Sequence, residues 1–119
     1  MRHFVKACKA LSDETRLRIL HLLMERDCYV YEVMRALEIS ETRASRNLGA
    51  LYDAGFLKAS RDGARCRYSI DREGLRRYSV DLLEAVDKAL QGNETALLDR
   101  QRLRSAAESR SGPAHGLSD

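Results

Sequence analysis

The chain has 119 residues, 44% of them hydrophobic, and a formal net charge of +3, which suits one domain with a small core. The sequence has no run of about 18 apolar residues, so we predict no membrane span. The N-terminus becomes polar too soon for a signal peptide. We therefore expect a cytoplasmic protein without a membrane partner. The three cysteines are an odd number and widely spaced, which argues against a disulfide framework, and they contain no Cys-x-x-Cys metal motif.

Two helices are predicted first. Residues 3–10 form a short helix whose apolar side holds Phe4, Cys8 and Leu11. Ser12-Asp13-Glu14 then supplies an N-cap and a first-turn acid for a helix that ends near Arg26. The buried stripe of this second helix contains Leu17, Leu20, Leu23 and Met24. Arg16 and Arg18 lie off that stripe, and we interpret them as solvated charges.

Residues 29–54 predict two further helices joined by a tight turn. The first has an apolar stripe with helical spacing, made of Val30, Val33, Met34 and Leu37. Ser40 can cap the second, because its hydroxyl can accept a backbone N–H at the open helix start. Ala44, Leu48 and Leu51 share the buried face of that second helix. This pattern predicts a helix-turn-helix.

The opposite face of the second helix carries groups that suit DNA. Hydroxyl, amide and guanidinium groups can bond to phosphates and to base edges in the major groove. We predict that this face reads DNA, and its candidate contact residues are Ser40, Thr42, Arg43, Ser45, Arg46 and Asn47.

A basic β-hairpin is predicted directly after this helix. Residues 56–61 and 66–70 read as strands, and Asp62-Gly63-Ala64 is a turn signal. The hairpin carries Lys58, Arg61, Arg65 and Arg67, which could lie along phosphates or enter the minor groove. The alternative is that these side chains only solubilise an exposed ribbon. A helix-turn-helix followed by such a hairpin predicts a mainly α fold with a β-hairpin wing, the winged helix-turn-helix.

A long last helix is predicted over residues 71–91. Its apolar stripe contains Leu75, Tyr78, Leu82, Leu83, Val86 and Leu90. The stripe could pack on its own domain or on a second copy, and a dimer would place two reading helices one DNA turn apart. We therefore expect a domain over residues 1–91 and a mostly disordered tail over residues 92–119, with at most a weak helix at residues 96–107.

Three segments together resemble a known family: residues 10–20, residues 39–48, and residues 54–57 with 61–63. Over residues 3–91 the chain resembles the ArsR/SmtB winged-helix transcriptional repressors. The resemblance implies a homodimer joined through the first and last helices, with Phe4 at the joint. It also implies operator binding through the segment 40–47 and release by a ligand. Glu14, Glu41 and Asn47 stand where Pro, Gln and His are common, and the last two changes bear on which operator is read.

The sensing residues of the family are only partly matched. Arsenic-responsive members carry Cys-Val-Cys followed by an acid, where this chain has Tyr29-Val30-Tyr31-Glu32. We expect both tyrosines to pack or hydrogen-bond at the helix junction. Cys28, together with Cys8, is the candidate ligand set for As(III) or another thiophilic ion, whereas Cys8 and Cys66 could equally be small buried hydrophobes. Asp81 and Asp87 on the last helix lack a histidine partner for a zinc site.

The hypothesis that joins these observations is a homodimeric DNA-binding repressor released by a metal(loid) ion such as As(III). A repressor that responds to thiol oxidation, or to no effector, is an alternative. A protein-interaction module on the same scaffold is an alternative from another class. We predict no enzyme, because no phosphate loop, catalytic carboxylate pair or nucleophile–base motif is present.

Overall fold

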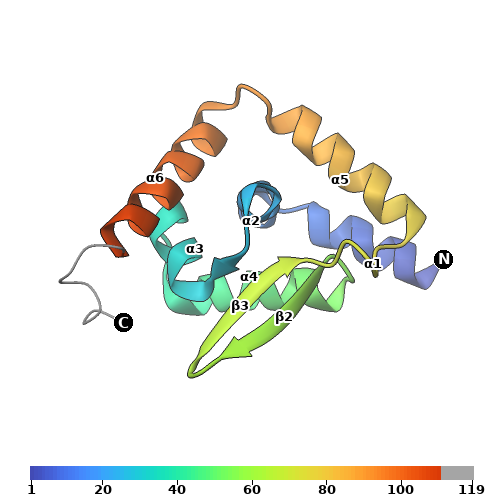
Figure 1. Cartoon of the computed structure of the whole chain (residues 1–119). Coiled ribbons are helices and arrows are strands. Elements are labelled where there is room, and N and C mark those ends of the chain that lie inside the picture. The colour runs from blue at the N-terminus through green and yellow to red at the C-terminus, as the bar shows by residue number, and fades with distance from the viewer. Residues whose placement is uncertain (111–119) are drawn as a thin grey trace.

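The computed structural model describes residues 1–110, which hold six helices and three strands. The helices are α1 (Arg2–Leu11), α2 (Glu14–Glu25), α3 (Val30–Leu37), α4 (Glu41–Asp53), α5 (Arg77–Leu90) and α6 (Glu94–Arg110). The strands are β1 (Cys28–Tyr29), β2 (Leu57–Asp62) and β3 (Arg65–Ile70). Figure 1 shows α2 at the centre, seen nearly along its axis, with the other helices around it and the β2–β3 hairpin projecting from one side.

The core forms around α2 because this helix is apolar on more than one side. Ile19, Leu20 and Leu22 are fully buried, and each such side chain stabilises the fold by about 1.5–3 kcal/mol. Apolar side chains of α3, α4 and the segment between α4 and β2 complete the same cluster, among them Val33, Ala44, Leu48, Leu51 and Phe56. The predicted buried faces of the two helices of the helix-turn-helix are thereby confirmed.

Two predicted N-caps are present with the expected hydrogen bonds. The Asp13 carboxylate accepts the backbone N–H of Arg16 at 3.0 Å. The Ser40 hydroxyl accepts the backbone N–H of Arg43 at 3.1 Å. Each cap pairs a backbone donor that has no partner within its helix. Between α3 and α4 the chain turns at Glu38, whose left-handed backbone (φ 57°) ends α3.

The predicted hairpin is confirmed. Strands β2 and β3 pair antiparallel from Leu57 opposite Ile70 to Asp62 opposite Arg65, and Gly63 occupies the turn with a φ of 67°. The sheet has the order β1-β3-β2, because Cys28 of the unpredicted strand β1 pairs with Tyr68. This pairing attaches the base of the wing to the start of α3.

The last predicted helix starts later than expected. Helix α5 begins at Arg77, not at residue 71, because the preceding segment folds as a turn. In that turn the backbone N–H of Gly74 donates to the carbonyl and side-chain oxygens of Asp71, at 3.0 and 3.2 Å. Leu75 therefore precedes the helix instead of belonging to its stripe. None of the helices in residues 1–110 is both long and apolar enough to cross a membrane.

The structure of residues 94–110 contradicts the prediction of a mostly disordered tail. They form α6, which packs against α2 and α3, with Ala96 and Leu103 fully buried. The Asp99 carboxylate, also fully buried, receives two hydrogen bonds of 2.8 Å from the Arg18 guanidinium. The interpretation of Arg18 as a solvated charge is therefore wrong, and the folded unit extends beyond residue 91. The rest of the predicted tail, residues 111–119, lies outside the described residues.

Candidate nucleic-acid interface

The outer face of α4 presents polar side chains to solvent. Thr42, Ser45 and Arg46 are exposed, while Ala44 and Leu48 on the other side are fully buried. Within the described part of the chain, the Arg46 guanidinium makes no hydrogen bond or ion pair, so its donors are available to an external acceptor. Three of the predicted contact residues therefore lie together on one accessible face.

Two other predicted contact residues point at least partly inward. Asn47 is only 8% exposed: its amide donates to the Arg43 carbonyl at 2.9 Å and accepts from Arg16 at 3.1 Å. The expectation that Asn47 lies on the exposed face is wrong, and so is the interpretation of Arg16 as solvated. Arg43 is exposed overall, but its guanidinium donates to the buried Thr15 hydroxyl at 2.8 Å. Partners from α2 hold both side chains.

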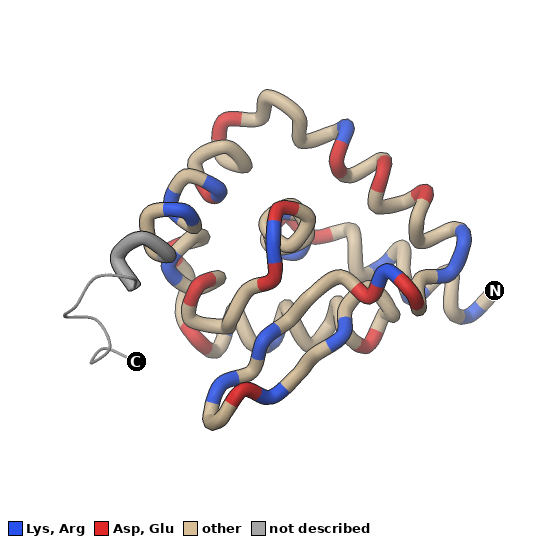
Figure 2. Tube along the Cα trace, viewed as in Figure 1, with Lys and Arg blue, Asp and Glu red and all other residues tan. Residues whose placement is uncertain are grey.

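Positive charge gathers along the wing. Figure 2 shows Lys and Arg on both strands of the hairpin, with an acid near the tip. Arg61 and Arg67 are exposed, although Arg61 also donates to the Ala64 carbonyl at 3.3 Å. Lys58 forms an ion pair of 3.5 Å with the exposed Glu73. The accessible cations of the wing are thus Arg61 and Arg67, with Lys58 in an exposed pair.

Arg65 has a different environment from its neighbours. Its guanidinium carbon lies 5.5 Å from the ring centres of both Tyr29 and Tyr31, and the two rings stack at 5.8 Å. The Tyr29 hydroxyl also donates to the Asp62 carboxylate. These contacts join the start of α3 to the wing. Both tyrosines thus pack at the helix junction, as predicted, and Arg65 is held against them.

The cysteines do not form a ligand set within one chain. Cys28 is fully buried, and burial, followed by the nearby Glu32 carboxylate, raises the pKa of its thiol to about 12. A thiol with such a pKa stays protonated at neutral pH, whereas soft metal ions bind thiolates. Cys8 is exposed, not a buried hydrophobe, and Cys66 is half-buried. No three His, Cys, Asp or Glu side chains in the described residues cluster as metal ligands.

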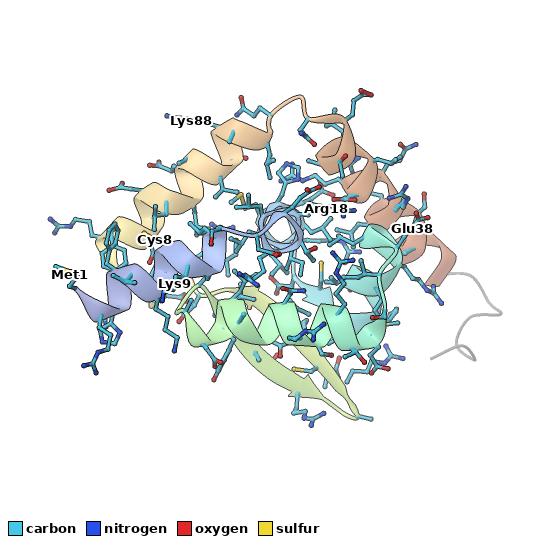
Figure 3. All side chains as sticks on the ribbon, turned by 180° about the vertical axis from the view of Figure 1, so that it is seen from behind. Met1, Cys8, Lys9, Arg18, Glu38 and Lys88 are labelled. Atoms are coloured by element: carbon cyan, nitrogen blue, oxygen red, sulfur yellow. The ribbon has the colours of Figure 1, made fainter. Side chains whose placement is uncertain are left out.

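Helices α1 and α5 leave apolar side chains uncovered. Phe4, Val5 and Val80 are 40–43% exposed, and the Phe4 ring meets Tyr78 edge-on at 5.0 Å. Figure 3 shows α1 and α5 together on one side of the molecule. An apolar hollow of about 240 Å³ lies beside them, lined by Leu11, Leu17, Leu82, Ala85, Val86, Ala89 and Leu90. Leu83, also predicted for the dimer contact, belongs to the core of its own chain.

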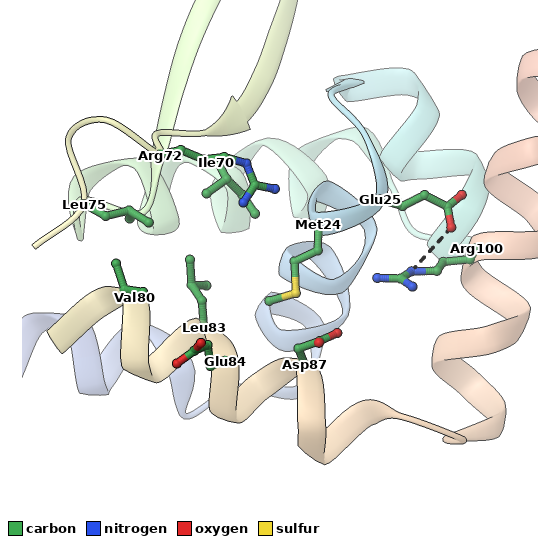
Figure 4. A pocket seen from close by; sticks show the side chains of 10 residues that line it. All are labelled: Met24, Glu25, Ile70, Arg72, Leu75, Val80, Leu83, Glu84, Asp87 and Arg100. Carbon is green, nitrogen blue, oxygen red and sulfur yellow. Dashed lines mark ion pairs between the residues drawn. The ribbon is translucent and has the colours of Figure 1, made fainter. Parts of the chain in front are cut away.

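A mixed cleft of about 500 Å³ lies on another face of α5 (Figure 4). Apolar and charged side chains line it in similar measure, and an ion pair of 3.7 Å between Glu25 and Arg100 closes one end. Its walls come from α2, β3, α5, α6 and the segment before α5, and comprise Met24, Glu25, Ile70, Arg72, Leu75, Val80, Leu83, Glu84, Asp87 and Arg100. No local sequence pattern indicated this cleft, because its walls are distant in the chain.

Comparison with known proteins places this geometry in a family. Residues 13–59 match the family model described as bacterial regulatory protein, arsR family. A probable mercury resistance operon repressor of Streptomyces lividans is 37% identical over 62 residues, which are 52% of this chain and 50% of that protein. The regulator CmtR of Mycobacterium tuberculosis is 31% identical over 78 residues, 66% of each chain. The chain thus spans only half to two thirds of the length of these relatives.

Solved structures agree with the sequence comparison. A crystal structure of a possible transcriptional regulatory protein (fragment 1–100) from Mycobacterium bovis is 30% identical, with a TM-score of 0.64, and covers 76% of this chain and 92% of that one. A solution structure from the same organism is described as a homodimeric winged helix-turn-helix DNA-binding domain of a possible ArsR-family regulator. It is 29% identical, with the same TM-score, and covers 78% of this chain and 82% of that one. The chain described here belongs to the ArsR family of bacterial transcriptional regulators, which are not enzymes.

Proposed function

We propose that this protein is a homodimeric transcriptional repressor that binds operator DNA through α4 and the wing in the cytoplasm. The observation that carries the proposal is the exposed face of α4. Ser45 and Arg46 stand there, the latter without a partner among the described residues, beside a hairpin that exposes Arg61 and Arg67. A helix with free donors enters a major groove, and flanking cations bind the phosphates.

The dimer part of the proposal rests on the uncovered apolar side chains of α1 and α5. Phe4, Val5 and the hollow beside Leu82 and Leu90 expose apolar surface, which soluble proteins normally bury in an interface. A two-fold axis near α1 and α5 would present two copies of α4 to one duplex. The relative from Mycobacterium bovis that is described as homodimeric supports a dimer, and the position of the axis is inferred from the apolar surface of this chain.

A selection experiment tests DNA binding and finds the preferred duplex at the same time. Duplexes with a randomised centre are enriched on the protein, and the affinity of the selected duplex is then measured by fluorescence anisotropy. Arg46→Ala should weaken binding by about 1–3 kcal/mol if Arg46 contacts a base. Arg67→Ala should lower the slope of log affinity against log salt by about 1, because one phosphate contact is lost.

Lys88→Ala is the matched control, because Lys88 is an exposed cation on the far side of the molecule from α4 (Figure 3). This variant should bind the selected duplex like the unchanged protein. Equal losses in Arg46→Ala and Lys88→Ala would contradict the proposed reading face. If no duplex is bound in a salt-dependent way, the protein-interaction module becomes the better hypothesis.

For the effector we propose a thiophilic metal or metalloid ion such as As(III), on family grounds. The relative from Streptomyces lividans is named for mercury resistance. The described thiols of one chain do not fit such an ion, because Cys28 is buried and protonated. Cys8 is the accessible thiol of α1, the helix proposed to meet the partner, so a site in the dimer would have to use it.

Titration of the protein–DNA complex with As(III), Zn(II) and peroxide tests this part separately. Release by As(III) that is lost in Cys8→Ser and kept in Cys28→Ser supports the metalloid proposal. Release by peroxide alone supports the oxidation-responsive alternative. A complex that responds to none of the three would support repression without an effector of these kinds.

A further inference from the structure

We propose that Arg16 and Asn47 position the reading helix, by hydrogen bonds that fix α4 to the end of α1. This inference rests on the proposed function, because positioning α4 affects DNA binding only if α4 reads DNA. Arg16 and Asn47 would not themselves touch the DNA. This positioning role also explains why the amide at position 47 is turned away from the face that carries Arg46.

Arg16 is the centre of this connection. Its Nε donates to the Ala10 carbonyl at 2.6 Å, and its Nη2 donates to the Lys9 carbonyl at 3.2 Å. Both carbonyls belong to the last turn of α1, where carbonyl oxygens lack partners within the helix and carry partial negative charge. A guanidinium is therefore well matched to this helix end, and its fork of donors can bridge several acceptors at once.

The third donor of Arg16 reaches the reading helix. Nη1 donates to the Asn47 side-chain oxygen at 3.1 Å, and the Asn47 amide nitrogen donates to the Arg43 carbonyl one turn earlier at 2.9 Å. The side-chain oxygen of Asn47 therefore accepts a hydrogen bond from α2, and its nitrogen donates one within α4. With 8% of its surface exposed, it is placed to hold α4, not to read an adenine.

The packing between α1 and α4 leaves a gap at this point. A hollow of about 280 Å³ lies between the two helices, and its lining includes Arg16, Lys9, Ala10 and Ala54. A hollow has no atoms to transmit a displacement by contact. The bonds of Arg16 therefore act together with the packing of the buried Ala7 and Ala10 in fixing α1 relative to α4. Arg43 and Thr15 form a second tie, from α4 to α2.

The consequence concerns how a change at the dimer contact reaches the DNA. Helix α1 carries Phe4 and Val5 at the proposed interface and the two carbonyls bound by Arg16 at its other end. A hydrogen bond of about 3 Å weakens steeply when its geometry is distorted. A displacement of α1 must therefore either move Arg16, and α4 with it, or break the connection.

Conservative variants separate positioning from base reading. Asn47→Asp keeps an oxygen acceptor for Arg16, and its charge strengthens that bond. It loses the amide donor, which an adenine contact needs and which bonds to the Arg43 carbonyl within α4. Asn47→Ala removes both groups. If the connection matters, Asn47→Ala and Arg16→Ala should each weaken the selected duplex about tenfold, and the double variant should be no weaker than either single one. Asn47→Asp should stay within about threefold of the unchanged protein.

Controls distinguish positioning from a general loss of fold. Urea midpoints and the sedimentation of each variant are measured first, and Arg16→Lys replaces Arg16→Ala if the latter does not fold. Binding to an unselected duplex, which reports phosphate contacts, should change less than twofold in Asn47→Ala. If Asn47→Asp binds as weakly as Asn47→Ala, while Arg16→Ala binds normally, Asn47 reads a base directly and the inference is wrong.

A readout without DNA keeps this inference separate from the proposed function. In Asn47→Ala, Arg16 loses the partner that holds it in place, and it should therefore bind the end of α1 less firmly. The backbone amides of residues 8–11 in α1 should then exchange with solvent about tenfold faster. Unchanged exchange there overturns the connection, whatever happens with DNA. Faster exchange together with no DNA binding leaves the connection standing and overturns the repressor proposal.

Discussion

The buried pair of Arg18 and Asp99 offers the sharpest test of how α6 is held. Asp99 is fully buried and Arg18 is 18% exposed, and two bonds of 2.8 Å join them. Asp99→Ala removes the acceptor and leaves a largely buried guanidinium without its partner. Breaking a buried pair in this way costs about 3–5 kcal/mol, and we expect the lower end, because water can still reach part of Arg18.

A loss of about 3 kcal/mol is large against a typical total stability of about 5–15 kcal/mol. With a urea slope of about 1–3 kcal/mol per molar, it lowers the unfolding midpoint by about 1–3 M. The measurement compares urea unfolding at one fixed protein concentration, since a dimer makes the midpoint depend on concentration. Amide exchange across residues 94–106 should rise most, because these residues dock through the pair.

Glu73→Ala is the matched control for this measurement. It removes the carboxylate of an ion pair with Lys58 whose side chains are 55% and 85% exposed, so it should cost at most about 1 kcal/mol. Replacing Arg18 and Asp99 together by Met and Leu should recover most of the loss, because neither of them is then left buried without its partner. Arg102, which also pairs with Asp99 at 3.7 Å, keeps its ion pair with Glu38. If Asp99→Ala costs no more stability than Glu73→Ala, the pair of Arg18 and Asp99 does not hold α6.

Three further predictions concern a cap, a histidine and a thiol. Ser40→Ala should destabilise the protein by about 1 kcal/mol in urea unfolding, because the Arg43 N–H loses its acceptor; Ser45→Ala, on the exposed face, should cost almost nothing. Burial, then the nearby Arg100, lowers the pKa of His21, so its neutral form favours folding. The stability that the neutral imidazole contributes is present above the unfolded pKa of about 6.5 and is lost as the pH falls below that value. His21→Leu should therefore lose less stability than the unchanged protein between pH 7 and pH 5. Cys28, with a pKa of about 12, should resist iodoacetamide at pH 8 until the protein unfolds, whereas the exposed Cys8 should react at once; equal rates would contradict the burial.

Local signals in the sequence were sufficient for the reading helix and the wing. Ser40 predicted the start of α4, and Ala44 and Leu48 predicted its buried face, because a cap and a helical stripe depend on residues within a few positions of each other. Asp62 and Gly63 predicted the hairpin turn for the same reason. The exposed position of Arg46 follows from this helical periodicity. The positive charge of the hairpin follows directly from the residues of its two strands.

Local residue patterns were therefore enough to predict the helix-turn-helix, the hairpin and most of the solvent-facing side of α4. Only the tertiary structure showed that Asn47 turns inward to Arg16, that Arg18 meets Asp99, and that α6 belongs to the fold. These pairs are separated by 31 and 81 positions in the chain, and a polar side chain looks the same in a sequence whether water or a distant partner binds it. Burial of a polar group depends on whether folding brings its partner within hydrogen-bond distance, and no local pattern of residues contains that information.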